Sequence, residues 1–311
     1  AALLLLPATP HAQGYPARPV RMIIPFTAGS ASDIIARAME PALRERLGQP
    51  LVIDNRGGAG GNIAAEQTAK SAPDGYTLMM ATIGTQAINI SLYTKLNYHP
   101  QRDFTPVTLV GDSPNAMVVN PVVPVKTMKD FIALAKSKPG VLNYGSSGAG
   151  TTVHLAGELF NLMANVKMVH VPYPASPAAM TAIIRGDVQI GMLPAIAVTP
   201  HAASGAVKIL AVSTAKRSPY LPSIPTLKEA GIDVEADAWN GLIAPARTPE
   251  PIVARIRREV VETIGTSAIR DKLAAQLMEP VGSTPEEFRA RIEAEISRWE
   301  PVIRSADIKV N

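Results

Sequence analysis

Residues 22–33 of the chain read MIIPFTAGSASD. An apolar run ends at a proline, a loop of small residues follows, and Ile34, Ile35 and Ala38 then continue at helical spacing. This pattern predicts a strand that passes through a small-residue loop into a helix. Small side chains let a ligand approach the backbone, and the first N–H groups of a helix have no partner inside it. The loop is therefore a candidate site for an anion.

Two further loops have the same construction. GGAGGN (57–62) follows the strand-like LVIDN (51–55), and SSGAGTT (146–152) follows VLNYG (141–145). Three helix N-termini facing one cleft would combine their dipoles. Because helix N-termini favour anions, an organic carboxylate is the expected ligand. Nucleotide phosphates are disfavoured, because Ile63 breaks the dinucleotide-binding spacing and no Walker lysine follows any loop.

The order of the segments predicts an α/β protein with two lobes. Two blocks of alternating strands and helices are followed by a long helical tail, which favours mainly parallel sheets flanked by helices. We expect two crossover connections, with a cleft between the lobes and closure on a hinge near Val118 and Leu242. The predicted lobes are 14–117 with 240–311, and 118–239.

The amino-acid composition limits the classes of binding partner that we expect. The net charge of +4 is spread over interleaved acidic and basic residues, and aromatic residues make up only 5% of the chain. These features exclude a basic nucleic-acid stripe, so no nucleic acid is expected. The chain has no Cys, and its five His residues show no H-x-x-x-H pairing, so we expect neither a metal nor a cofactor.

The first residues differ from the rest. AALLLLPATPHAQ (1–13) is uncharged and apolar before its proline and small residues, as in the truncated end of a secretory signal peptide. A simple N-terminal tail is the alternative. No later stretch has eighteen uninterrupted apolar residues, so no membrane span is expected after it. Export without cysteine fits a bacterial periplasmic protein.

A serine hydrolase is a competing hypothesis. The elbow pattern G-x-S-x-G centred on Ser147 fails because Ala149 replaces its last glycine, and His154 is only a few residues away in sequence. No catalytic residue is therefore predicted. Asp33 and Asp130 are most simply read as helix caps, and Tyr173 fits a core position as well as a cleft wall.

Several motifs occur together in a characteristic order. They are YPARPVRMIIPFTAGSASD, GQPLVIDNRGGAGGNIAAE, PDGYTL, LNYGSSGAGTTVHLAGELF, VPY, IPTLKEAG and WNGLIAPARTPEPIVARI. With these motifs the chain, from about Tyr15 to beyond Trp299, resembles the substrate-binding receptors of tripartite tricarboxylate transporters, the Bug family of periplasmic proteins. The resemblance implies a monomeric Venus-flytrap protein that binds a small organic acid and delivers it to a membrane permease. An extracytoplasmic sensor for a signalling partner is the alternative.

The resemblance also implies ligand-binding positions. In relatives one carboxylate is held largely by backbone N–H groups and water around the first loop, and the second lobe closes over it. By motif, the implied residues of this chain are Phe26, Thr27, Ala28, Gly29, Gly60, Gly61, Thr82, Thr85, Ser146, Ser147, Thr151, Thr152, His154 and Tyr173.

The chain departs from the family pattern at three places. Residues 27–30 read TAGS where relatives commonly have PPGG, and 171–175 read VPYPA instead of VPYKG. Leu193 stands where many relatives have a polar or acidic residue. If Leu193 faces the ligand, an ammonium group would lack its counter-charge, which favours a plain mono- or dicarboxylate over an amino acid.

Overall fold

The segment quoted above forms a strand, a loop and a helix as predicted. In the computed structural model, which describes residues 14–310, β1 (Val20–Ile24) is buried and α1 (Ala31–Leu47) begins after Ser30. The Ser30 side chain caps α1, and Gly48 ends it in the left-handed conformation at φ 70°. The expected signal-peptide remnant, 1–13, lies outside the described residues.

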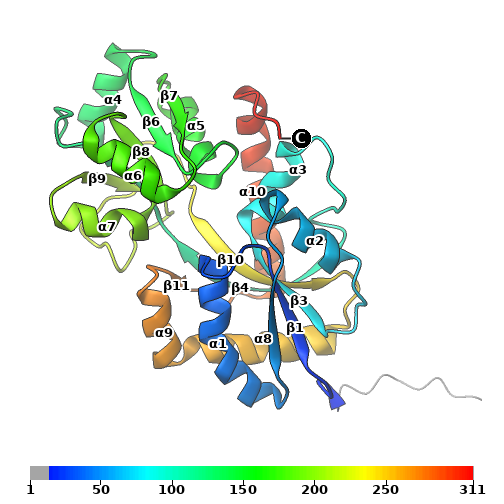
Figure 1. The fold of residues 1–311 in the computed structure, drawn as a ribbon. Coiled ribbons are helices and arrows are strands. Elements are labelled where there is room, and N and C mark those ends of the chain that lie inside the picture. The colour runs from blue at the N-terminus through cyan, green and yellow to red at the C-terminus, as the bar shows by residue number, and fades with distance from the viewer. Residues whose placement is uncertain (1–13, 311) are drawn as a thin grey trace, which may run out of the picture.

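The first lobe is built on a six-stranded sheet in the order β11-β4-β10-β3-β1-β2 (Figure 1). Its helices cover both faces of the sheet. The remaining strands are β2 (Leu51–Asn55), β3 (Thr77–Thr82), β4 (Phe104–Ser113), β10 (Ala238–Pro245) and β11 (Glu279–Pro280). The remaining helices are α2 (Asn62–Ala69), α3 (Asn89–Leu92), α8 (Glu250–Gly265), α9 (Ser267–Ala274) and α10 (Pro285–Ser305).

The second lobe has a five-stranded sheet in the order β7-β6-β8-β5-β9. Its strands are β5 (Asn115–Val119), β6 (Asn143–Ser146), β7 (Val169–Pro172), β8 (Ile190–Pro194) and β9 (Lys208–Val212). Its helices are α4 (Met128–Ser137), α5 (Thr152–Ala164), α6 (Ser176–Arg185) and α7 (Ala195–Ala203). The Thr127–Asp130 capping box at the start of α4 and the Thr284–Glu287 box at the start of α10 are both formed.

The sheets are mixed, where mainly parallel sheets were expected. β1 is parallel to β2 and β3, but β10 is antiparallel to β3 and β4, and β5 is antiparallel to β8 and β9. The reason is the connection between the lobes: β4 carries the chain out of the first sheet and the adjacent β10 brings it back. Strand–helix alternation predicts direction only inside an uninterrupted block.

The chain changes sheets at Pro114, between β4 and β5, and again between β9 and β10. The predicted boundaries at 117/118 and 239/240 fall inside β5 and β10, close to these points. Where the two lobes divide as moving bodies stays a prediction.

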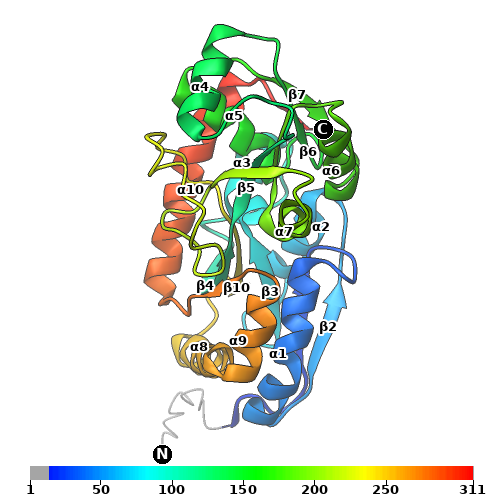
Figure 2. The same cartoon turned by 90° about the vertical axis from the view of Figure 1, so that its left-hand side faces the viewer.

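Packing joins the lobes along one side. α10 packs on β4 of the first lobe and also meets α5 of the second, so it runs beside both (Figure 2). Trp239 of β10 and Phe288 of α10 meet edge to face, with ring centroids 5.3 Å apart. Within residues 14–310, no helix combines the length and apolarity needed to cross a membrane.

Candidate functional site

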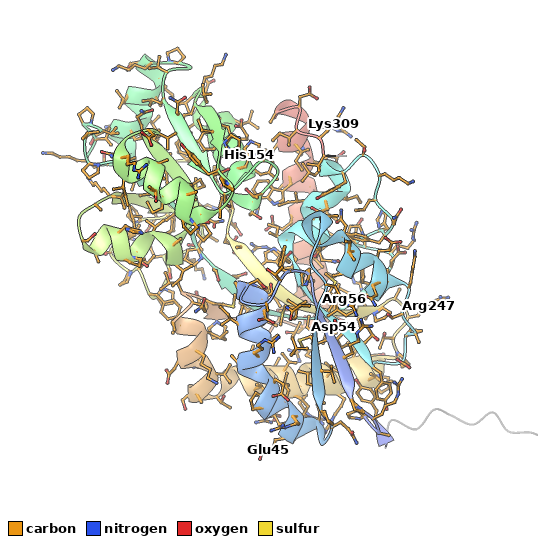
Figure 3. All side chains as sticks on the ribbon, in the orientation of Figure 1. Glu45, Asp54, Arg56, His154, Arg247 and Lys309 are labelled. Atoms are coloured by element: carbon orange, nitrogen blue, oxygen red, sulfur yellow. The ribbon has the colours of Figure 1, made fainter. Side chains whose placement is uncertain are left out.

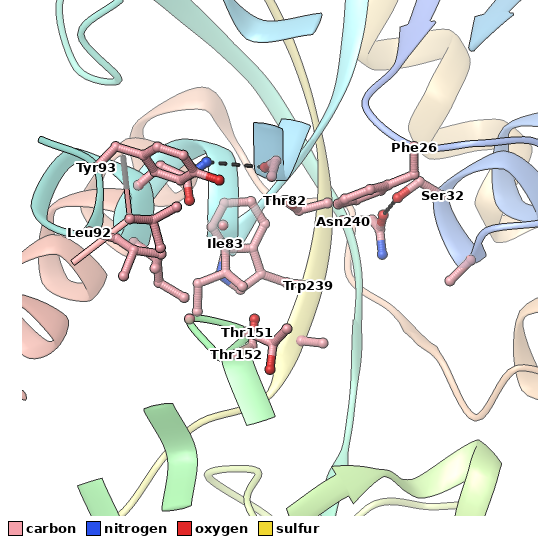
Figure 4. Close-up of a pocket in the computed structure, with 18 of the residues that line it drawn as sticks. Phe26, Ser32, Thr82, Ile83, Leu92, Tyr93, Thr151, Thr152, Trp239 and Asn240 are labelled. Carbon is pink, nitrogen blue, oxygen red and sulfur yellow. Dashed lines mark hydrogen bonds between the residues drawn. The ribbon is translucent and has the colours of Figure 1, made fainter. Parts of the chain in front are cut away.

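A cavity of about 510 Å³ lies between the lobes, a size typical of small-molecule sites (Figure 4). Both lobes contribute to its wall. It is lined by Phe26, Ala31, Ser32, Gly60, Thr82, Ile83, Gly84, Ile88, Asn89, Leu92, Tyr93, Ala149, Gly150, Thr151, Thr152, Ala238, Trp239, Asn240 and Val310.

The N-terminus of α1 faces this cavity from the first lobe. Ser30 is its N-cap and accepts a hydrogen bond from the Asp33 N–H at 3.4 Å. Ala31 and Ser32, the first two helical residues, both line the cavity. Residues at these positions have no helical acceptor for their N–H groups, so they offer donors to a guest.

A buried carboxylate holds the loop before α1. Asp33 accepts hydrogen bonds from the Gly29 N–H at 2.9 Å, from Arg37 Nε at 2.9 Å and from Asn55 Nδ2 at 3.0 Å. Burial alone would raise the pKa of Asp33, but the bonds from Arg37, Gly29 and Asn55 outweigh it and lower that pKa below its usual value. The Gly29 N–H is therefore already hydrogen-bonded within the protein and is not a free donor for a ligand.

The N-terminus of α5 faces the same cavity from the second lobe. Thr151 caps the helix by accepting from the His154 N–H at 3.4 Å, and Thr152 is the first helical residue. Both threonines line the cavity. The Gly150 N–H donates to His154 Nδ1 at 2.9 Å, so His154 holds this loop from behind.

His154 is neutral at physiological pH. Its ring is buried and stacks on His170 with centroids 3.7 Å apart, and burial lowers the pKa of His154 to about 4. Figure 3 labels it on α5, within the second lobe. A neutral ring can accept the Gly150 hydrogen bond, whereas an imidazolium could not.

The rest of the wall includes residues that were not among the implied ligand-binding positions, such as Ser32, Asn89, Trp239 and Asn240. Ser32 Oγ donates to Asn240 Oδ1 at 2.5 Å, and Asn89 Nδ2 donates to the Gly60 carbonyl at 3.1 Å (Figure 4). The indole N–H of Trp239 is buried and has no partner among the described residues. Trp239 lines the cavity with other atoms of its side chain, while this nitrogen is an unpaired donor inside the surrounding packing.

Five of the fourteen implied ligand residues line this cavity: Phe26, Gly60, Thr82, Thr151 and Thr152. The other nine lie outside its wall. Thr27, Ala28 and Gly29 form the exposed part of the first loop. Gly61, Ser146 and Ser147 belong to the second and third loops but do not line the cavity, and neither do Thr85, His154 and Tyr173.

Some of these nine residues support the loops. Thr85 Oγ1 accepts from the Thr82 N–H at 3.2 Å and donates to the Thr82 carbonyl at 3.1 Å. Ser146 Oγ accepts from the Gly148 N–H at 3.2 Å. Direct ligand contact by any of the fourteen residues stays a prediction, and geometry favours a positioning role for Thr85, Ser146 and His154.

Leu193 does not face the candidate ligand site. Its side chain is fully buried in the core of the second lobe, packed with Ala116, Val118 and Ile183, and it does not line the cavity. The preference against an amino acid therefore loses this support.

The geometry does not favour the hydrolase hypothesis. No hydrogen bond joins Ser147 to His154 within residues 14–310, and His154 Nδ1 is occupied by Gly150. A different pair is close, with Ser146 Oγ 2.6 Å from His170 Nε2, but Ser146 is fully buried. A nucleophile must reach its substrate, so this buried pair is a structural contact.

One acidic cluster near the interlobe strands has ligand-like spacing. The carboxylates of Glu235, Asp237 and Glu295 lie within 4.8 Å of one another. Arg291 pairs with all three, at 3.0, 2.7 and 2.8 Å. Its guanidinium already supplies the positive charge that a cation would bring, so we assign the cluster to an ion-pair network.

Comparison with known proteins identifies the family. Residues 35–308 match the model of the tripartite tricarboxylate transporter family receptor. Protein BugT of Bordetella pertussis is 36% identical over 301 residues, which cover 96% of this chain and 92% of BugT.

Two solved structures from Rhodopseudomonas palustris are similar throughout. One, with adipate, has a TM-score of 0.80 and 38% identity, covering 95% of this chain and 99% of that one. MatC with bound malate has a TM-score of 0.75 and 33% identity, covering 93% and 100%. The likeness spans both lobes, and the chain belongs to the tripartite tricarboxylate transporter receptor family, the Bug family of periplasmic solute-binding proteins.

Proposed function

We propose that this protein is a periplasmic receptor that binds a small organic carboxylate between its lobes and delivers it to a tripartite tricarboxylate-type transporter. One observation carries the proposal: the N-termini of α1 and α5 line a single cavity from opposite lobes. Each terminus brings unpaired N–H donors and the positive end of a helix dipole, both of which favour an anion.

Because the two helix termini lie on opposite lobes, a ligand that binds both of them would hold the lobes closed around it. An acid that bonds to Ala31 and Ser32 in one lobe and to Thr152 in the other stabilises the arrangement in which both termini are close. The ligand then favours the closed form by its differential affinity for that form. A closed receptor presents one surface to a permease, which is how delivery would follow from binding. Adipate and malate, bound by the two similar proteins, are both carboxylates.

Binding is tested by comparing organic acids with their methyl esters, using calorimetry and thermal unfolding of the full chain. Esterification removes a charged acceptor and leaves buried donors unpaired, which costs about 1 to 3 kcal/mol per group. We expect at least a tenfold loss of affinity. Equal affinity for an acid and its ester would contradict the carboxylate proposal.

Delivery is tested separately by ligand uptake into vesicles that contain the permease subunits. Uptake should require the receptor and saturate with it. Specific binding to a sensor kinase, with no stimulation of uptake, would favour the alternative sensor function instead.

A further inference from the structure

A cluster of charged side chains lies where the chain passes between the lobes, outside the cavity wall. Asp112 is near the end of β4, two residues before Pro114, and Asp237 directly precedes β10. The strand register places Asp112 opposite Trp239 of β10 and opposite Glu279 of β11. Directly opposed residues point to the same face of a sheet, so Asp112 and Glu279 bring two carboxyl groups together there.

The segment 235–237, which leads into β10, is bonded to the second lobe. The Ala236 N–H donates to the Ser213 carbonyl at 2.9 Å, just beyond the end of β9. The Ala236 carbonyl accepts from Asn115 Nδ2 of β5 at 2.7 Å. These bonds fix the backbone of the segment to the second sheet.

The side chains of the same segment are bonded to the first lobe. Arg291 of α10 pairs with the Glu235 and Asp237 carboxylates, at 3.0 and 2.7 Å. Arg298, also on α10, donates to the Glu235 carbonyl at 3.2 Å. A rotation of one lobe relative to the other must therefore change how this segment meets α10 and the neighbouring end of β4.

Carboxylates outnumber cations in this cluster. Its cations are Arg291 and Arg298, and both also pair with Glu295 of α10, at 2.8 and 3.0 Å. Its carboxyl groups are those of Asp112, Glu235, Asp237, Glu279 and Glu295. Like charges held close together disfavour one another, so the loss of one negative charge is favoured.

Asp112 is the carboxyl group of this cluster that lacks a partner. Its Oδ1 is buried and has no hydrogen-bond partner within residues 14–310, and no ion pair joins it to Arg291 there. Burial raises the pKa of Asp112, neighbouring carboxylates raise it further, Asp237 most strongly, and the resulting pKa is about 8 despite the opposing charge of Arg291. A neutral carboxyl also supplies an O–H donor that a nearby carboxylate can accept.

We propose that Asp112 links lobe closure to a proton: its carboxyl group is neutral in the arrangement described here and ionises when the lobes separate. This inference rests on the proposed closure around a ligand and adds a control by pH. Both lobes line the cavity in this arrangement, so it is the one that a ligand stabilises. Loss of the proton opposes closure, and ligand affinity therefore falls as the pH rises.

The first test follows the lobes without any ligand. The chain has no Cys, so Glu45→Cys on α1 and Lys136→Cys on α4 give one spin-label pair, on exposed positions of different lobes (Figure 1). With Asp112 present, the closed population should be at least threefold smaller at pH 9 than at pH 6. Asp112→Asn, which cannot ionise, should give the same label distances at both pH values. Label distances that do not change with pH in the chain with Asp112 would overturn the inference.

The second test asks whether the folded chain keeps Asp112 neutral. Its folded pKa of about 8 is above the ordinary 3.8, so the folded chain binds more protons between these values and loses stability as the pH rises through them. The folded-to-unfolded ratio of Asp112→Asn, relative to wild type, should rise at least tenfold from pH 6 to 9 in urea unfolding. Asp271→Asn, at an exposed position on α9, is the matched control and should show no such rise. A ratio that stays constant for Asp112→Asn would also overturn the inference.

Calorimetry with malate separates this inference from the proposed function. Both malate carboxyl groups are ionised from pH 7 to 9, so the acid itself adds no pH dependence. Malate affinity should fall at least threefold over this range in wild type and stay constant in Asp112→Asn. Affinity that is independent of pH in wild type would overturn the inference and leave the proposed function intact. Absence of malate binding would count against the proposed function, and the label distances would still decide whether Asp112 controls the lobes.

Discussion

The loops after β1 and β6 are built alike, although they belong to different lobes. In each, a glycine with positive φ, Gly29 at 83° or Gly150 at 74°, precedes the hydroxyl residue that caps the helix. The glycine N–H donates to a side chain four residues later at 2.9 Å in both cases. That side chain is Asp33 in the first lobe and His154 in the second.

The difference between these two anchors is their charge. Asp33 brings a carboxylate to the N-terminus of α1, and Arg37 and Asn55 are needed to satisfy it. His154 is neutral and leaves the dipole of α5 uncompensated. The second-lobe terminus therefore has more attraction left for a bound anion. A carboxylate and a neutral imidazole can thus both hold such a loop. The carboxylate, however, weakens the attraction of the helix N-terminus for a bound anion, and the neutral ring does not.

The largest expected effect comes from removing the charged anchor. Asp33→Ala leaves Gly29, Arg37 and Asn55 without their shared acceptor and should lower the free energy of unfolding by about 3 kcal/mol. His154→Ala loses only neutral contacts and should lower it by about 1 to 2 kcal/mol. Urea unfolding at pH 7 measures both values.

Asp33→Asn is the matched control, because it keeps the size and one acceptor oxygen and should lie between wild type and Asp33→Ala. If His154→Ala proved more damaging than Asp33→Ala, charge would not be what distinguishes the two anchors.

The two loops should also respond to acid in different pH ranges. The folded pKa of His154, about 4, is below its ordinary value of 6.5, so the unfolded chain binds more protons between these values. The stability that neutral His154 provides is fully present above pH 6.5 and is lost as the pH falls through about 4. For Asp33, whose pKa is lowered from 3.8, the corresponding loss begins only below that value.

The size of the histidine effect is on the order of 2 kcal/mol, allowing for solvent near the ring. Unfolding free energies of wild type and His154→Asn, measured from pH 7 to 4.5, should converge as the pH falls. Parallel curves would show that His154 does not titrate in this range.

The strand–loop–helix units could be predicted because their signals are local. Apolar runs, cap residues and glycine stops lie within a few positions of one another, and the boxes at Thr127 and Thr284 form as expected. Strand directions in the sheets could not be predicted, since they depend on where β4 leaves and β10 returns, separated by a whole lobe.

The residues of the candidate site likewise fall into those that local sequence patterns predict and those that they do not. Phe26, Gly60 and Thr151 lie in recognisable loops, whereas Trp239 and Asn240 enter the cavity from β10. The Ser32–Asn240 hydrogen bond joins residues 208 positions apart. No local pattern marks such a pair. The unpartnered indole N–H is visible only once the packing around it is known.

Replacing each loop glycine by alanine should have a smaller effect on the protein, and the effect on ligand affinity should differ between the two because their surroundings differ. A Cβ at Gly150 would lie 3.0 Å from Leu92 Cδ2 of the other lobe, whereas a Cβ at Gly29 would meet nothing within 4 Å. Both Gly→Ala variants force alanine into a left-handed conformation, costing about 1 kcal/mol of stability. Gly150→Ala should in addition lower ligand affinity about tenfold, because Leu92 must shift for the lobes to close.

Calorimetry with the tightest acid found measures this second effect. Equal affinity losses in Gly29→Ala and Gly150→Ala would indicate that backbone strain, and not the contact between lobes, controls binding.

The smallest effect concerns the caps themselves. Ser30→Ala and Thr151→Ala each remove a hydroxyl that accepts an N–H, and each should cost about 1 kcal/mol of unfolding free energy. Thr127→Ala, a cap on α4 that does not line the cavity, sets the baseline for a cap without ligand contact.

Ligand affinity should then distinguish the three caps. Thr151 lines the cavity and Ser30 does not, so Thr151→Ala should weaken acid binding several-fold more than Ser30→Ala, and Thr127→Ala should leave it at the wild-type value. If Ser30→Ala weakened binding as much as Thr151→Ala, the two helix termini would contribute equally despite their different anchors. In that case Arg37 would neutralise Asp33 so completely that the charge difference between the loops has no effect on the ligand.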